Sequence, residues 1–387
     1  MSWEDGFPFE LSDEERMAQE TARAFSKNEV LPLAAELDRE HRYPAELIPK
    51  MGALGLMGAC VPTEFGGSGL STVAYCLMVE ELAAACASTS IIMSAHNSLC
   101  IAPIVAAGSV EQKQRYLPDL CSGKTVGCFA LSEPGCGSDA ASLSCRVEKQ
   151  GDHYIVNGAK NWITNGPVAD VCVLFATHDT AGGHKAVSAF VHPMEIAGLA
   201  RGKKEDKLGI RGSPTCGLTY ENVKLTSANL LGAERSGFKV AMSTLNGGRL
   251  GVAAQAIGIA RAALRDALSY SKERKTFGVP ICEHQSIQNY LSEMIIQIDA
   301  ARALTLGAAR LKDRGAAYIR QAAMAKLYAS EAAMFAAIKG VQIHGGYGYV
   351  SDYPAERHLR DAKITEIYEG TSEIQRIVIA SQLVKES

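Results

Sequence analysis

A carboxylate at the start of a predicted helix has the setting that best suits proton transfer in this chain. Glu369 lies on a short loop directly after Ile367 and Tyr368. The spacing of Ser372 and Gln375 is that of a capping box, which predicts that a helix begins just after Glu369. A carboxylate among apolar neighbours has a raised pKa and can act as a base near neutral pH, while backbone N–H groups at the helix start can polarise a carbonyl. The simpler interpretation is an acidic residue that is favourable at a helix N-terminus.

Three other clusters carry groups that suit a planar, phosphorylated ligand. Residues 129–139 run from an apolar stretch into a glycine-rich turn, whose hydroxyl and N–H groups suit an anion. Trp162 beside Thr164 suits stacking on a flat ring with a hydrogen bond to its edge. Arg274 follows a long predicted helix and could hold a pyrophosphate through paired hydrogen bonds. The structural alternatives are an ordinary β-turn, a core tryptophan and a basic helix C-terminus.

Several other chemistries are not supported by the spacing of the residues they need. Residues 123–125 resemble the end of a phosphate-binding loop, but Pro118 stands where that loop requires glycine. The 9 histidines and 11 cysteines have no metal-ligand spacing, so no metal site is predicted. With 39 basic and 42 acidic residues and no basic arm, nucleic acid is not an expected partner.

The elements that must position these clusters change character twice along the chain. Residues 1–125 are mostly helical in pattern, and Ser12 with Glu15 forms a capping box for the first helix. Residues 126–232 contain short β-branched runs, which glycine-containing turns at 151–152 and 157–158 separate. Residues 233–387 return to long helical patterns. This order predicts an α+β protein with an antiparallel middle domain, and the missing β-α alternation excludes a Rossmann or TIM architecture.

Length and composition are those of a globular protein with two or three domains, since the chain has 387 residues of which 21% are charged. The cysteines lack paired spacing, which predicts mostly buried thiols in a reducing cytoplasm. Residues 1–5 show no targeting signal. Residues 82–110 lack any charged side chain and are long enough to span a membrane, but their composition and acidic flanks favour buried helices.

At this order and spacing, the four clusters together resemble the acyl-CoA dehydrogenase family over essentially the whole chain. Residues 203–213 and 354–362 add to the resemblance, which is greatest to the short-chain, butyryl-CoA branch. The resemblance implies an N-terminal all-α domain, a middle antiparallel β-barrel-like or sandwich domain and a C-terminal four-helix bundle. It also implies an FAD-dependent homotetramer of fatty-acid β-oxidation, with electron-transferring flavoprotein as the electron acceptor.

The resemblance assigns binding roles to residues in each cluster. Those implied to line FAD within one subunit are Phe129, Leu131, Ser132, Ser138, Trp162, Ile163, Thr164, Thr371 and Glu373. Those implied to reach the FAD of a neighbouring subunit are Arg274, Thr276, Phe277, His284, Gln285, Gln342, Gly345 and Gly346. Those implied to touch the acyl-CoA are Ser138, Asn246, Arg249 and Gly370.

The chemistry implied by the resemblance is α,β-dehydrogenation of an acyl-CoA thioester. Glu369 would remove the α-proton, and the β-hydride would pass to flavin N5. Some branches of the family carry the base just before the arginine equivalent to Arg249, but here that position is Gly248, which cannot serve. Asn246 stands where relatives often have an acid, and Gly247 is small. A branched, cyclic or aryl-substituted acyl-CoA is therefore the alternative substrate, followed by an oxidase-like enzyme or a non-catalytic acyl-CoA- or flavin-binding subunit.

Overall fold

The N-terminal third of the chain is a bundle of helices, as predicted. The computed structural model describes residue 3 and residues 9–386. The prediction that residues 1–5 carry no targeting signal therefore falls mostly outside the described residues. The predicted capping box opens the first helix, because Ser12 Oγ accepts from the Glu15 N–H at 3.2 Å while Glu15 Oε2 accepts from the Ser12 N–H at 2.9 Å. The helices are α1 (Asp13–Phe25), α2 (Ala34–Arg39), α3 (Leu47–Ala53), α4 (Thr72–Ala85), α5 (Ala87–Ala95), α6 (Ala102–Ala107) and α7 (Val110–Cys121).

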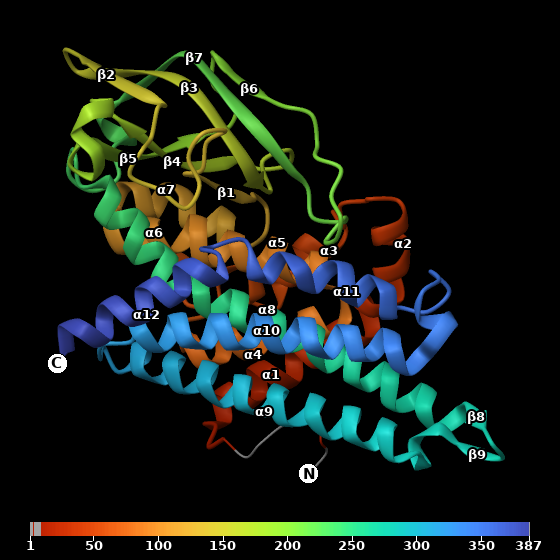
Figure 1. Cartoon of the computed structure of the whole chain (residues 1–387). Helices are drawn as coiled ribbons and strands as arrows, with labels where there is room; N and C mark the ends of the chain where they lie inside the picture. The colour runs from red at the N-terminus through yellow and green to blue at the C-terminus, as the bar shows by residue number, and fades with distance from the viewer. Residues whose placement is uncertain (1–2, 4–8, 387) are drawn as a thin grey trace.

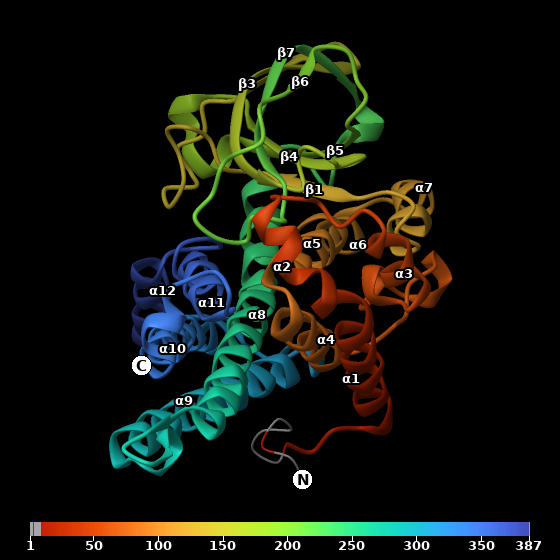
Figure 2. The ribbon, with the colours of Figure 1, turned by 90° about the vertical axis from the view of Figure 1, so that its right-hand side faces the viewer.

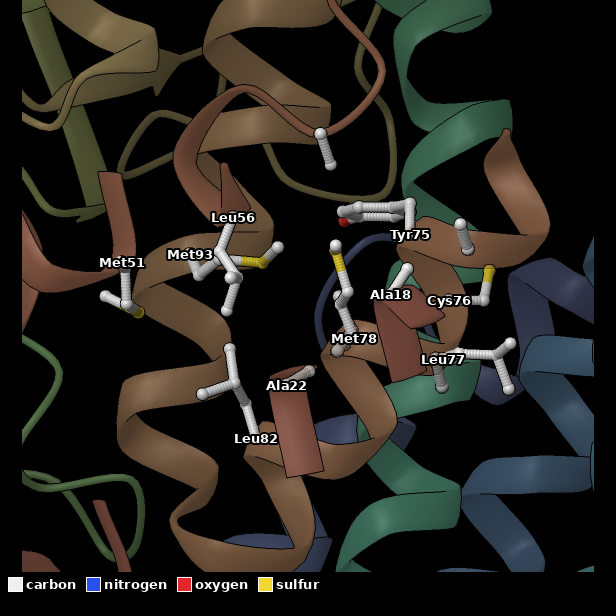
Figure 3. Close-up of a cluster of buried hydrophobic side chains, with 14 of the residues drawn as sticks. Ala18, Ala22, Met51, Leu56, Tyr75, Cys76, Leu77, Met78, Leu82 and Met93 are labelled. Carbon is white, nitrogen blue, oxygen red and sulfur yellow. The ribbon is translucent and has the colours of Figure 1, made fainter. Parts of the chain in front are cut away.

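The uncharged stretch forms the centre of this bundle. Met78 and Leu82 of α4 point into the same core as Met93 of α5 and Ala22 of α1 (Figure 3). Within the described residues, Ala87–Ala107 is long and apolar enough to cross a membrane, but 72% of that stretch is buried inside the protein. Burial of this kind is typical of a core helix, as the composition predicted.

The middle of the chain forms one strongly curled sheet (Figure 2). The strand order is β1-β4-β2-β3-β7-β6, and β5 pairs with β4 in addition. Both β1 and one residue of β2 pair along one edge of β4, and β5 pairs along its opposite edge. The pairing is antiparallel except where β1 and a single residue of β2 run parallel to β4. The strands are β1 (Gly127–Ala130), β2 (Arg146–Gln150), β3 (His153–Thr164), β4 (Val171–Thr177), β5 (Val187–Pro193), β6 (Leu199–Arg201) and β7 (Thr215–Thr226).

One of the two predicted turns in this domain is wrong. The turn at 151–152 joins β2 to β3 as expected, but Asn157 and Gly158 lie inside β3. The register against β7 shifts between Val156 and Gly158, where one residue of β3 lies opposite two of β7, as in a β-bulge whose extra residue is on β7. Gly158 has φ +147°, and a Cβ there would lie 2.6 Å from the Cα of Cys145. The glycine therefore allows a close approach and a bend within one strand.

The last third of the chain is helical again, and α8 runs between the N-terminal helices and α10–α12 (Figure 2). The three long predicted helices are present. A 3-10 turn (Gly345–Gly348) occupies the glycine-rich break. The elements are α8 (Gly237–Glu273), β8 (Lys275–Thr276), β9 (Val279–Pro280), α9 (Gln285–Asp313), α10 (Ile319–His344), α11 (Ala355–Lys363) and α12 (Ser372–Glu386).

Charged contacts connect the first and last parts of the chain. Arg310 on α9 donates to both carboxylate oxygens of Glu15, at 2.6 and 2.8 Å. Asp313 accepts from the N–H groups of Thr72 and Val73 at 2.7 and 3.2 Å, so a side chain of α9 caps the N-terminus of α4. Both carboxylates therefore find hydrogen-bond donors that are remote in sequence, and for Glu15 the donor is a cation.

Candidate active site

Glu369 lies in a sharp turn between α11 and α12. Glu369 has φ +52° and Gly370 has φ +92°, so two successive residues adopt left-handed conformations. The side-chain amide of Gln375 donates to the carbonyl oxygens of Glu369 and Gly370 at 3.2 and 2.9 Å. The helix begins at Ser372, close to the predicted place, but the predicted capping box is wrong. Ser372 Oγ has no hydrogen-bond partner among the described residues; Thr371 Oγ1 accepts from the Ile374 N–H instead, and Gln375 turns back to the loop.

The Glu369 carboxylate is enclosed without a partner. Both of its oxygens are buried, and neither has a hydrogen bond to any residue that the structure describes. A Cβ on Gly248 would lie 2.0 Å from Oε2 and 3.3 Å from Leu99, so the carboxylate fits against a bare patch of α8 beside a leucine. Burial raises the pKa of Glu369 to about 7, although the positive charges of Lys326 and Arg249 lower it. A carboxylate with this pKa can accept a proton at neutral pH.

Two buried cations flank the turn. Arg249 on α8 donates to Asn246 Oδ1 at 2.8 Å, and its Nε has no partner. Lys326 on α10 donates to the carbonyl oxygen of Gly370 at 2.8 Å. The structure therefore gathers three of the four expected acyl-CoA residues around Glu369. The fourth, Ser138, is exposed on a loop of the middle domain.

One face of α8 leads away from the base and is closed by paired side chains. Gly251, one turn beyond Gly248, faces Tyr75 and Ser94, whose hydroxyls are 2.8 Å apart. Gln255, one turn further, is buried and accepts from the Tyr368 hydroxyl while donating to the Ala87 carbonyl at 3.0 Å. Paired side chains therefore occupy this face of α8 at one and two turns, roughly 5 and 10 Å, beyond the base.

The expected flavin residues of the middle domain lie on two adjoining segments. The Asn161 N–H donates to the Ser132 carbonyl at 2.9 Å and joins the 131–138 loop to β3. Trp162 has φ +61° and is 61% exposed, so the core alternative for this tryptophan is wrong. Leu131 and Ile163 have buried side chains, so only their backbones can face a ligand. Phe129 and Thr164 are half-buried.

A buried ion pair that sequence reasoning missed holds this loop in place. Glu133 Oε1 and Lys160 Nζ are 2.7 Å apart, and both side chains are inaccessible to solvent. Lys160 also donates to the Leu131 carbonyl at 3.0 Å, and Glu133 accepts from Ser144. Burial alone would raise the pKa of Glu133, but the Lys160 ammonium and these hydrogen bonds hold it below its usual range. The only sign of this pair in the sequence is that Lys160 takes a buried position in β3, where the other buried positions are apolar.

The residues expected to reach a neighbouring subunit gather at the far end of the C-terminal helices. Arg274, Thr276, Gly345 and Gly346 line an open cavity of about 620 Å³. Thr276 Oγ1 and His284 Nε2 are 2.9 Å apart, while Phe277 at the hairpin tip is 97% exposed. Gln285, Gln342 and Glu373 are exposed on their helices and do not line this cavity.

This cavity and the middle-domain segments do not meet within one chain. The β8–β9 hairpin lies at the opposite end of the molecule from the curled sheet in both views (Figures 1 and 2).

Comparisons with known proteins place the whole chain in one family. Residues 12–124, 128–223 and 235–384 match the descriptions "Acyl-CoA dehydrogenase, N-terminal domain", "middle domain" and "C-terminal domain". The chain belongs to the acyl-CoA dehydrogenase family. It is an FAD-dependent oxidoreductase that acts on acyl-CoA in fatty-acid metabolism, as the sequence resemblance predicted.

Its relatives include enzymes of the short-chain branch. The chain is 50% identical over 376 residues to the human "Short-chain specific acyl-CoA dehydrogenase, mitochondrial", covering 97% of this chain and 91% of that protein. Butyryl-CoA dehydrogenase from Megasphaera elsdenii has a TM-score of 0.95 and 44% identity, with 98% and 100% of the two chains covered. A chain from a structure titled as the electron transferring flavoprotein of Acidaminococcus fermentans has a TM-score of 0.96 and 46% identity, with the same coverage.

The residues present fit FAD. Trp162 offers an open ring face, and a Cβ on Gly135, Gly137, Gly345 or Gly346 would meet no atom within 4 Å, so the backbone at all four is open to a ligand. Arg274 beside the cavity suits a pyrophosphate. Within one chain these two groups lie at opposite ends of the molecule.

Proposed function

We propose that this protein converts a short-chain acyl-CoA to the trans-2-enoyl-CoA, with Glu369 as the group that removes the α-proton. One observation carries the proposal: the Glu369 carboxylate is buried, without a hydrogen-bond partner, against the bare backbone of Gly248. A base in that state has no hydrogen bond to break before it accepts a proton. Its pKa of about 7 lies close to neutral pH, where a general base works best.

The neighbouring residues would hold the thioester against this base. The amide N–H of Glu369 sits at the turn itself and would donate to the thioester carbonyl, where negative charge develops as the α-proton leaves. Arg249 and Asn246, which are joined by a hydrogen bond, would fix the region of the ligand beside α8. FAD, when bound, supplies the acceptor for the β-hydride. The protein aligns the two C–H bonds and keeps water away from them.

The cofactor would be shared between subunits of a homotetramer. Trp162, Ser132 and Thr164 would contact the ring system from one chain, with Ser138 near the acyl-CoA and Thr371 and Glu373 completing that side. Arg274, Thr276 and Phe277 would reach it from a neighbour. The separation of these two groups within one chain supports this arrangement. We also propose domain limits at residues 1–125, 126–232 and 233–387, which lie close to the limits of the three family matches.

A short acyl chain is supported by the closure of the α8 face. The Tyr75–Ser94 and Gln255–Tyr368 pairs fill the next two turns beyond the base. The space beside Gly248 is taken by Glu369, so this glycine opens no room for a branched or cyclic group, whereas a Cβ on Gly247 would make only an ordinary contact of 3.4 Å with Lys312 Nζ. Adjacent chain lengths should still overlap, since one methylene changes binding by only about 1–3 kcal/mol.

Electron-transferring flavoprotein is the proposed electron acceptor. The support is the similar chain in a solved structure whose title names that protein.

The proposal is tested by anaerobic visible spectra of the purified protein with a panel of acyl-CoA esters. We expect the flavin absorbance to bleach fastest with butyryl-CoA, and reoxidation to follow when electron-transferring flavoprotein is added. Fastest bleaching by a branched, cyclic or long acyl-CoA would replace the substrate. Failure to bind FAD after reconstitution would contradict the function itself.

A further inference from the structure

Lys326 is a charged residue buried in the helical core. Its side chain is 0% exposed on α10, and its neighbours on the same helix include the buried residues Ala322, Ala325 and Ala329. A lysine is almost never fully buried unless its ammonium is paired, because removal of the charge from water is costly. Its position therefore needs an interaction that compensates for burial.

The interaction is with the turn that carries the base. Lys326 Nζ donates to the carbonyl oxygen of Gly370 at 2.8 Å, and the Gln375 amide donates to the same oxygen at 2.9 Å. Two donors thus converge on one carbonyl of a backbone with positive φ at Glu369 and Gly370. Such a backbone is strained for Glu369 and persists only when its surroundings fix it.

The Lys326 ammonium forms no ion pair of 4.0 Å or less with any carboxylate in the part of the chain described. It nevertheless acts on Glu369 through space. Burial lowers the pKa of Lys326 to about 8, and the Glu369 carboxylate raises it. The charged and titratable groups that face this pair are Arg249 on α8, Glu366 before the turn, Glu373 on α12, Tyr75 on α4 and Tyr368.

We propose that Lys326 is a positioning residue for dehydrogenation: it fixes the Glu369–Gly370 turn through the Gly370 carbonyl, and its charge keeps the base ionised. This inference rests on the proposed role of Glu369. It assigns two separable contributions to Lys326, a hydrogen bond that sets geometry and a charge that favours the carboxylate.

Two substitutions separate these contributions. Lys326→Gln keeps a donor near Gly370 and removes the charge, whereas Lys326→Met removes both. The rate of flavin bleaching by butyryl-CoA should fall at low pH as Glu369 becomes protonated. Without the lysine charge this fall should occur about one pH unit higher in both variants, because the pKa of Glu369 rises. Only Lys326→Met should also lose rate at its best pH. Lys339→Met on the same helix is the matched control, because its ammonium lies 4.3 Å from the Tyr290 ring centroid, and its fall in rate should stay at the wild-type pH.

A second measurement does not depend on turnover. Infrared difference spectra across pH give the titration of the carboxylic acid band that disappears in Glu369→Gln. This band should titrate about one unit higher in Lys326→Gln than in the wild type. An unchanged titration, with the fall in rate at low pH also unchanged, would overturn the inference even if the rate at the best pH were lower.

The same variants show whether the role of Glu369 or only the role of Lys326 is wrong. If Glu369→Gln bleached at the wild-type rate, the proposed base would be wrong whatever Lys326 does. If Glu369→Gln is inactive and the Lys326 variants titrate as the wild type does, only the role of Lys326 fails. Thermal unfolding and flavin content of each variant show that it is folded; if Lys326→Met does not fold, Lys326→Gln alone decides.

Discussion

Glu369 occupies the space that a side chain at position 248 would need. An ideal Cβ on Gly248 would lie 2.0 Å from Glu369 Oε2 and 3.1 Å from its Cδ. Such distances do not occur between a real Cβ and another heavy atom, so one of the two groups would have to move. The glycine in the middle of a 37-residue helix is thus a requirement of the carboxylate, although it weakens the helix itself.

Gly248→Ala should therefore separate stability from activity. We expect the helix to gain up to about 1 kcal/mol from the better helix former, offset by displacement of Glu369. The rate of flavin bleaching should fall about a hundredfold, because the base moves out of line. The control is Gly307→Ala on α9, where a Cβ meets nothing within 4 Å. This control should gain stability and keep its rate; equal rates in both variants would contradict the assigned contact.

Glu369→Gln should bind acyl-CoA and fail to use it. Loss of a positioned general base lowers the rate by about 10²–10⁴-fold. Stopped-flow absorbance measures flavin bleaching, and spectral perturbation by the ligand measures binding. Glu366→Gln is the matched control, since Glu366 lies three residues earlier and pairs with Lys363 at 2.6 Å. Bleaching by Glu369→Gln within a few-fold of the wild-type rate would sink the assignment.

The raised pKa of Glu369 also predicts a pH dependence of stability. The folded protein binds the proton more tightly than the unfolded chain, because burial moves the pKa from 4.5 to about 7. This contribution is fully present below pH 4.5 and is lost as pH rises through 7. At about 1.4 kcal/mol per unit, the wild type loses at most about 3 kcal/mol that Glu369→Gln does not lose. Denaturant unfolding should show the glutamine variant more stable than the wild type at pH 8, with a smaller difference at pH 5. An equal difference at both pH values would contradict the buried, ionised carboxylate.

The Glu133–Lys160 pair should be costly to break from one side. Lys160→Met leaves a buried carboxylate without its cation, and we expect a loss of about 3–5 kcal/mol in the free energy of unfolding, with weaker FAD retention. The double variant with Glu133→Gln should lose less than the sum of the two single variants. Lys149→Met is the control in the same domain, because its pair with Glu234 is partly exposed and solvent screens it, so its loss should cost much less stability. Additive losses would show that the pair is not coupled.

The features that could be predicted from the sequence are those whose residues lie close together along the chain. The helices and several strands follow from periodicity, and Glu369 is recognisable because the carboxylate, its apolar neighbours and the helix start lie within nine residues. The misread cap shows the limit of such a signal. Ser372 and Gln375 have capping-box spacing, yet the Gln375 amide is drawn to the carbonyls of Glu369 and Gly370 by a turn whose φ angles the pattern does not encode.

The remainder depends on residues that meet only in the folded chain. Lys160 is 27 residues from Glu133, and Lys326 is 44 residues from Gly370. Each looks like an ordinary lysine in a strand or a helix, because nothing nearby in sequence requires it to be buried. The pattern predicts a turn at Asn157 and Gly158 because asparagine followed by glycine is typical of turns, although both residues continue a strand opposite a bulge in β7. Only the approach of Cys145 explains why glycine is needed there.

The capping of α4 by Asp313 has a consequence for how the chain is made. Asp313 follows Thr72 by 241 residues, and Arg310 follows Glu15 by 295. At 5–20 residues per second, a ribosome takes roughly 10–60 s to add the chain between such partners. During that interval Glu15 lacks its Arg310 partner and the N–H groups of Thr72 and Val73 lack the Asp313 carboxylate, although Ser71 already caps the start of α4 through the Ala74 N–H. The first third of the chain can therefore form its last contacts only after the last third has been synthesised.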